Sequence, residues 1–369
     1  MFKRIAISLG LLACITCLIQ AQEEDVVLGK KRSEWLKLLK ESKNPKARQG
    51  SLLALAVIGP KEGVVNGILE ALSKDADANV RREAINVLTG MGKEAKGAVD
   101  ALGEALQKDK SEIVREAAAR SLAKFGLQAE SQVLILAAAL EDKHAGTRAA
   151  AAETLNELGE KARPALPKLL KVLSNKDSDH FTRTYAALIL VKISDEPRKL
   201  VPALTAALAD KDSPVKVREA VIYGLSSLGT EAADSAEALA KILAEKKEKV
   251  ELRRSAAVAL ARVGAKVNVA WPAAKIALAD TDNSLRYQAI RLAGAFAKEE
   301  KAVVPALADA AAKDDNTENR LAAIQELGQL GNVAADAVPT LTRLASGDSR
   351  ASIREAAEDA LKKIKASGQ

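Results

Sequence analysis

The chain has little of what most enzymes use for chemistry. Of its 369 residues only two are histidine and two are cysteine, and Cys14 and Cys17 both lie close to the N-terminus. Beyond Cys17 there is therefore no disulfide, no thiolate metal ligand and no thiol nucleophile. The formal net charge of +7 at pH 7 is modest for this length because acidic and basic residues are interleaved. We expect no nucleic-acid partner, since a basic balance of this size is weak evidence for one.

The N-terminal segment has the order of a secretory signal peptide. Two basic residues precede an apolar run, Ile5 to Ile19, which is too short to span a bilayer, and acidic residues follow. We expect cleavage after Ala21, so that the mature chain begins at Gln22, has no transmembrane span and is periplasmic or extracellular. The alternative is processing as a lipoprotein, with a lipid anchor on Cys14.

One motif recurs ten times and organises the rest of the chain. Its clearest copy, Asp75 to Gly92, has an acidic turn, an Arg, a small residue three positions later, a Leu four after that, then an apolar residue and Gly. Offsets of 3, 7 and 10 from the Arg fall on one helix face, so they predict a buried face. Consecutive arginines are 33 to 35 residues apart: Arg48, Arg81, Arg115, Arg148, Arg183, Arg218, Arg253, Arg286, Arg320 and Arg354.

This pattern resembles the HEAT repeat, and within it the short HEAT-like variety of the phycobilisome lyases, over residues 30 to about 366. The resemblance implies an all-α fold: a right-handed α-solenoid of about ten helical pairs, with the second helix of each pair on the concave side. We divide the chain into a signal peptide (1–21), an acidic lead or linker (22–29) and the repeat solenoid (30–369). The leader makes it an exported bacterial member of this class.

Local signals predict where the helices begin and end. Ser33 is the expected N-cap of the first helix, and the second runs from about Lys46 to Ile58. Gly follows the apolar residue in seven repeats, where a positive φ ends a helix. Five prolines are expected to begin first helices, where their missing N–H costs nothing: Pro164, Pro202, Pro272, Pro305 and Pro339.

An Asp stands six residues before the Arg in eight repeats. There it can accept backbone hydrogen bonds at the start of the second helix and pair with its own or the neighbouring Arg. The resemblance implies that such pairs form a ladder along the stack. Lys247 occupies the position in repeat seven, so we expect weaker coupling from Lys246 to Val250. The predicted ladder comprises Asp75, Arg81, Asp109, Arg115, Asp142, Arg148, Asp177, Arg183, Asp212, Arg218, Asp280, Arg286, Asp314, Arg320, Asp348 and Arg354.

No catalytic constellation is visible. His144 and His180 are followed by Ala145 and Phe181, not by the Glu of the di-iron deoxyhypusine hydroxylases, which are HEAT-like enzymes. The chain is too poor in aromatic residues to match the HEAT-like DNA glycosylases, and the repeats alone carry no bilin-lyase residue. We expect no enzyme activity, no metal and no cofactor. The alternative is a lyase-like or other enzyme subunit that is active only with a partner.

The composition does not exclude a binding function. In repeats six to eight, offsets 1 and 5 from the Arg point away from the predicted core and include Tyr223, Arg254, Tyr287 and Arg291. Tyr and Arg are enriched where binding energy concentrates. We therefore expect a non-enzymatic scaffold that binds a protein or peptide partner there, on the concave face of the exported solenoid, and ordinary surface is the alternative interpretation.

The leader generates the first testable prediction. Intact-mass measurement of the protein purified from its native envelope should give the mass of the chain that begins at Gln22. A lipid on Cys14 would refute cleavage after Ala21 while leaving export intact.

Overall fold

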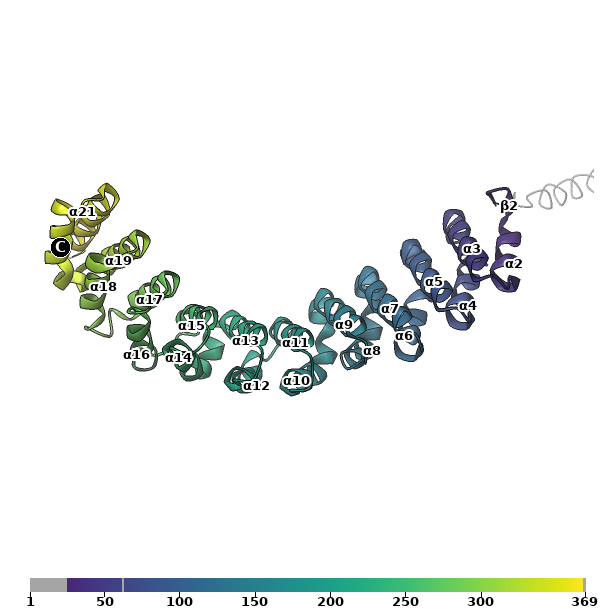
Figure 1. Cartoon of the computed structure of the whole chain (residues 1–369), viewed down its shortest axis with the longest axis horizontal. Helices are drawn as coiled ribbons and strands as arrows, with labels where there is room; N and C mark the ends of the chain where they lie inside the picture. Colours follow the sequence, from purple (N-terminus) through teal and green to yellow (C-terminus); the bar gives the residue numbers. More distant parts are fainter. Residues whose placement is uncertain (1–24, 62, 368–369) are drawn as a thin grey trace, which may run out of the picture. The chain divides into compact units, whose positions relative to one another are not determined.

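The computed structural model describes residues 25–61 and 63–367, which are helical almost throughout (Figure 1). The expected leader, its cleavage site and Cys14 lie outside the described residues. Among the described helices, none is long and apolar enough to cross a membrane. The chain divides into two compact units, one ending at Leu158 and the other beginning at Gly159. They are called unit 1 and unit 2.

Unit 1 holds four helical pairs. Second helices pack on one another in sequence, and first helices do the same, so the unit has a first-helix layer and a second-helix layer. The pairs are α2 (Arg32–Glu41) with α3 (Pro45–Ile58), α4 (Val64–Lys74) with α5 (Ala78–Met91), α6 (Ala98–Lys108) with α7 (Glu112–Phe125), and α8 (Val133–Ala139) with α9 (Ala145–Leu158).

Unit 2 repeats this arrangement with six pairs, and the predicted all-α solenoid is confirmed (Figure 1). They are α10 (Leu166–Ser174) with α11 (His180–Ile193), α12 (Pro197–Ala209) with α13 (Val215–Ser227), α14 (Ala236–Ala244) with α15 (Val250–Arg262), α16 (Val267–Ala277) with α17 (Asn283–Phe296), α18 (Val303–Lys313) with α19 (Thr317–Leu330), and α20 (Val338–Gly347) with α21 (Ala351–Ala366).

The predicted buried face of the second helices is confirmed. In α7, Ala118 and Leu122 are fully buried and Phe125 is 8% exposed, at offsets 3, 7 and 10 from Arg115. The small residue at offset 3 lets the neighbouring helix approach closely. The buried Leu at offset 7 is worth roughly 1.5–3 kcal/mol for its removal from water. Because every repeat has this face, each one buries its core against its neighbours.

Glycine ends seven of the second helices, as the sequence predicts. All seven have positive φ, and Gly92 (φ 58°, ψ −134°) lies in a region that side-chain-bearing residues avoid. Short 3₁₀ segments follow five of these glycines and lead to the next first helix: η1 (Gly92–Glu94), η2 (Gly126–Gln132), η3 (Gly159–Ala165), η4 (Gly229–Ser235) and η5 (Gly331–Ala337).

A two-stranded hairpin precedes the first helical pair. Strands β1 (Val26–Val27) and β2 (Lys30–Lys31) pair antiparallel, and the indole N–H of Trp35 donates to the Val27 carbonyl at 3.0 Å. Helix α2 begins directly after the hairpin, with Lys31 as N-cap, so the predicted N-cap Ser33 is wrong by two residues. The Glu34 carboxylate accepts the Lys31 backbone N–H at 2.8 Å and fixes the earlier start.

The prediction that five prolines begin first helices is correct for only some of them. Pro305 and Pro339 lie in the first turns of α18 and α20. Pro202 and Pro272 instead lie inside α12 and α16, because these helices begin a full turn earlier, at Pro197 and Val267. A proline there removes one helical hydrogen bond, and both rings are on the exposed side. Pro164 lies within the 3₁₀ segment η3.

The core assignment generates the second prediction. Leu225→Ala should destabilise the protein by roughly 2–5 kcal/mol, because Leu225 is fully buried at offset 7 of α13. Asp212→Ala should cost less than about 0.5 kcal/mol, because Asp212 is exposed in the preceding turn. Urea unfolding followed by circular dichroism compares the two. Equal losses would show that the core face is misassigned.

Candidate functional site

A buried ion pair links each repeat to the next within unit 1. Arg81 donates from Nε and Nη2 to the two carboxylate oxygens of Asp109, at 2.7 and 2.8 Å, and from Nη1 to the Asp75 carbonyl at 2.8 Å. Asp109 also accepts the backbone N–H of Ser111 at 2.8 Å. One guanidinium therefore holds the turn of its own repeat and the turn of the following repeat.

The sequence left open whether the Arg pairs with its own Asp or with a neighbour's. The structure shows that its side chain pairs with the acid of the following repeat, while the Asp of its own repeat offers only a backbone carbonyl. Arg148 and Arg354 make the carbonyl contact to Asp142 and Asp348, at 2.8 and 2.7 Å. The other side-chain pairs to an Asp of the next repeat at offset −6 are Arg48–Asp75, Arg115–Asp142, Arg253–Asp280, Arg286–Asp314 and Arg320–Asp348.

In repeats five and six the predicted ladder positions, Asp177 and Asp212, are wrong. Each lies two residues too late, because the turns of these repeats are longer. The turn-forming acceptor is Asn175 in repeat five, which takes the backbone N–H of Asp177 at 3.0 Å, and Asp210 in repeat six. Arg183 faces Asp210 at 3.8 Å. The signal was present in the sequence, since the arginine spacing rises to 35 residues here.

The predicted break at Lys247 is also wrong. Arg218 donates to the carboxylate of Glu248 at 2.7 Å, and the side chains are only 4% and 11% exposed. The longer glutamate, one residue further along, reaches the guanidinium that an Asp would otherwise meet. Coupling therefore continues through the segment from Lys246 to Val250.

The pairing shifts the pKa of the ladder acids. Burial alone would raise the pKa of the Asp109 carboxyl, but hydrogen bonds from Arg81 and from the backbone of Ser111 outweigh it and hold the pKa below its usual value. Burial and hydrogen bonding oppose each other in the same way, with the pKa again lowered, at Asp142, Glu248, Asp280 and Asp314. These carboxylates stabilise the fold in their charged form.

The four predicted contact residues lie on the exposed face of three successive second helices of unit 2. Tyr223 of α13 is 60% exposed and Tyr287 of α17 is 37% exposed, while Arg254 of α15 and Arg291 of α17 are partly exposed. Helix α15 packs against both α13 and α17. The structure therefore places all four outside the core, and their binding role stays a prediction.

Both arginines of this face already have an acidic partner. Arg254 binds the Asp282 carboxylate, and Arg291 binds Glu326 of α19. Burial raises the pKa of Glu326 although the charge of Arg291 opposes this shift, so the carboxyl is partly desolvated. The charge of the face is thus largely balanced internally, and the tyrosines are its free binding groups.

One tyrosine of the neighbouring second helix, α11, is not among the predicted contact residues. Tyr185 of α11 is half-buried, and its ring centroid lies 4.6 Å from that of Phe181. With it, all three tyrosines of the protein lie on second helices of unit 2. The sequence position could have indicated this, because Tyr185 stands at offset 2 from Arg183, and offset 2 points toward the same side of the helix as offset 5.

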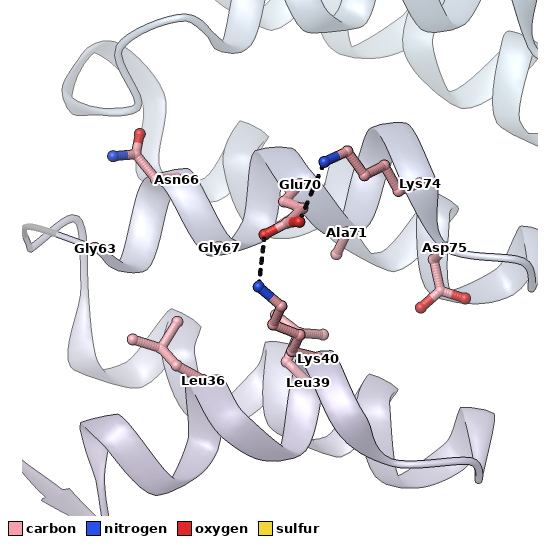
Figure 2. A pocket seen from close by; sticks show the side chains of 10 residues that line it. All are labelled: Leu36, Leu39, Lys40, Gly63, Asn66, Gly67, Glu70, Ala71, Lys74 and Asp75. Carbon is pink, nitrogen blue, oxygen red and sulfur yellow. Dashed lines mark hydrogen bonds and ion pairs between the residues drawn. The ribbon is translucent and has the colours of Figure 1, made fainter.

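A groove of about 410 Å³ lies between α2 and α4 in the first-helix layer. Leu36 and Leu39 line it on one side, and Glu70 lies between Lys40 and Lys74, at 3.9 and 3.3 Å (Figure 2). Equivalent grooves with the same acid–lysine pair recur between α4 and α6 and between α16 and α18. These hollows are consequences of stacking two first helices and carry no individual chemistry.

The histidines offer little for metal or acid–base chemistry. His144 lies 3.6 Å from the carboxylate of Glu116 and contacts the Thr147 hydroxyl at 3.3 Å. His180 is the first residue of α11. Across residues 25–61 and 63–367, no three His, Cys, Asp or Glu side chains gather in a way that could hold a metal ion. The expectation of no metal and no cofactor stays a prediction.

These features define an α-solenoid repeat protein, and sequence comparison gives the family. The model of the HEAT repeats matches residues 32–123, 65–156, 99–184, 166–261 and 272–362. The chain belongs to the HEAT-repeat family. No curated protein matched the sequence.

Solved structures share the fold at low sequence identity. An engineered protein is 20% identical, with a TM-score of 0.56, over 90% of this chain and 98% of that one. Importin beta is 11% identical with a TM-score of 0.64, over 91% and 53%. Kap121p is 16% identical with a TM-score of 0.60, over 96% and 43%. The chain thus spans about half the length of the importin beta and Kap121p structures.

The ladder generates the third prediction. Asp109→Asn should lower the free energy of unfolding by about 1–3 kcal/mol at pH 7, because it leaves the buried Arg81 without a charged partner. Because the folded pKa of Asp109 lies below the usual 3.8, the wild-type pair stabilises fully above that value and is lost as the pH falls through the folded pKa. The deficit of the variant should therefore shrink below about pH 4.

Asp212→Asn is the matched control, because it changes an exposed turn carboxylate of the same type. Urea unfolding of both variants and the wild type at several pH values measures the difference. A deficit for Asp109→Asn that stays constant down to pH 2 would contradict the ion-pair explanation.

Proposed function

We propose that this protein is an exported, non-enzymatic scaffold that binds a protein or peptide partner on the exposed face of α13, α15 and α17. The observation that carries the proposal is the concentration of tyrosine. The chain has three, and each lies on a second helix of unit 2, where Tyr223 and Tyr287 expose large parts of their rings. In a chain with 2% aromatic residues, exposed rings on one face are the strongest candidates for binding contacts.

The physical properties of this face suit a polypeptide. Tyr offers rigid apolar area with a hydroxyl that can donate or accept a hydrogen bond, and it loses little conformational entropy on binding. Arg254 and Arg291 extend the face with planar donor groups, while their ion pairs keep it close to neutral. A partner of mixed or mildly acidic character fits better than a strongly basic one.

The fold supports a binding role in general. Repeat solenoids present long continuous surfaces, since each repeat adds one more exposed helix to the layer. Among the similar structures, Kap121p is bound to Nup53p in one and to Ste12p in another. Binding of another protein, with an unrelated partner, is also what we propose for this chain. The leader in the sequence supports action outside the cytoplasm.

The fourth prediction tests the tyrosines. Tyr223→Ala with Tyr287→Ala should leave the helical signal and the melting temperature nearly unchanged, because neither ring is part of the core. The double variant should bind the partner less tightly, by more than about 1 kcal/mol for each true hot spot. The partner is first identified by crosslinking in the native envelope and mass spectrometry, and binding is then measured by calorimetry.

A matched double variant separates this face from ordinary surface. Leu134 and Val333 are also exposed apolar residues, 67% and 43% exposed, but lie outside the second helices. Leu134→Ala with Val333→Ala should leave binding unchanged. Unfolding of the tyrosine variant would show that the rings belong to the core, and unchanged binding would show that the face is not the contact site.

A further inference from the structure

A second apolar surface lies in unit 1, on the first of its second helices. Leu53 and Val57 of α3 are one helical turn apart and are 54% and 75% exposed. They stand at offsets 5 and 9 from Arg48. No other repeat has an aliphatic side chain larger than Ala at both positions, and at offset 9 the remaining nine repeats have only Gly, Ala, Ser, Gln or charged residues. This repeat departs from the pattern where burial within the stack cannot explain it.

Leu53 borders a groove of about 480 Å³ between α3 and α5, and Val57 lies one turn further along α3, beside the groove but outside its lining. Leu53 and Ala56 form one side, and Val87 and Met91 belong to the other. Gly90 leaves the groove open, because a Cβ built there would meet no atom within 4 Å. Its volume falls in the range of sites that hold small ligands or a few side chains of a bound segment. Unlike the hollows of the first-helix layer, it includes no ladder residue.

The charged side chains that line the groove are both acidic, while Lys61 and Lys96 line an adjoining hollow together with Glu94. Glu83 and Glu94 are the charged residues that line it, and neither enters an ion pair in the described part of the chain. The C-terminal ends of α3 and α5 also reach the groove, at Gly59 and Met91, and neither helix has a basic residue in its last turn. Helix C-termini carry partial negative charge, so they add to the two carboxylates.

We infer that the α3–α5 groove is a docking site for a segment of another protein that carries one or two aliphatic side chains flanked by Lys or Arg. The aliphatic side chains cover Leu53 and Val57, and the cations lie against Glu83 and Glu94. This site lies in unit 1, does not involve the tyrosines of unit 2, and stands independently of the function proposed above.

The test uses the mature chain and an array of 12-residue peptides in which two positions vary between Leu and Ser and two between Lys and Glu. Peptides with both Leu and Lys should bind, and the best of them should bind at least about tenfold more tightly than its Glu-bearing counterpart in fluorescence anisotropy. Added salt should weaken this binding, because the rim charges are exposed. No preference for Leu with Lys across the array would overturn the inference.

Variants then locate the binding on the groove. Gly90→Leu adds a side chain where a Cβ meets no atom within 4 Å, replaces a poor helix former by a good one, and should weaken the best peptide by at least about tenfold. Glu83→Gln with Glu94→Gln should remove the preference for Lys over Glu. Leu134→Asn, which changes an exposed leucine of α8, is the matched control and should leave binding unchanged.

Three results would contradict the inference. The first is equal binding of the best peptide by wild type and Gly90→Leu. The second is a concentration-dependent dimer in sedimentation that Gly90→Leu dissociates, since a second copy of the chain would then be the occupant. The third is peptide binding only after residues 1–21 are removed, which would make the chain's own N-terminal segment the occupant.

Discussion

The stack depends on one repeated electrostatic contact: in eight of the ten repeats, an arginine at the start of the second helix reaches forward to an acid in the next turn. The contact is nearly dry, because the side chains of Arg115 and Asp142 are only 7% and 13% exposed. Such a pair contributes little net energy compared with an apolar packing of equal volume, but losing one partner is costly. Its main effect is therefore to fix the register between neighbouring repeats, while the apolar face supplies the stabilisation.

Because the ion pair sets the register and the apolar face supplies the stabilisation, the turns can vary in length while the repeats stay stacked. The guanidinium has five donors and can use them in more than one arrangement. Arg81 holds Asp109 with two of them, whereas Arg218 donates to the Leu208 carbonyl and to Glu248. The longer turns of repeats six and seven therefore keep the same coupling with a different acid, Asp210 or Glu248. A single rigid geometry would not tolerate insertions of two residues.

The sequence predicts the parts of the fold that rest on helical periodicity and on glycine. The buried residues of α7 and the positive φ at Gly92 follow directly from offsets and residue type. Prediction from the sequence fails where a contact depends on loop length and on side-chain length, as at Asp212 and Lys247. The number of residues between an acid and the Arg does not show where the turn places the carboxylate. The start of α2 is predicted wrongly for a related reason. The hairpin before it fixes the direction of the chain, and a two-residue strand has no sequence signature.

The candidate surfaces could be predicted only in part, because a solenoid has some offsets that face neighbouring helices and others that face solvent. Offsets 3, 7 and 10 face neighbouring helices and are constrained by packing, whereas offsets such as 1, 5 and 9 face solvent and are free to change. A departure from the repeat at a free offset therefore needs no structural compensation, and its explanation is sought in a partner. Tyr223 and Val57 are such departures, and both are visible once the ten repeats are aligned on their arginines.

The acids that neutralise Arg254 and Arg291 are not visible in this way, since they come from later turns and helices at distances along the chain that only the packing defines. The same alignment thus identifies where binding groups stand, but their charge balance, and with it the kind of partner they fit, emerges only from the packed structure.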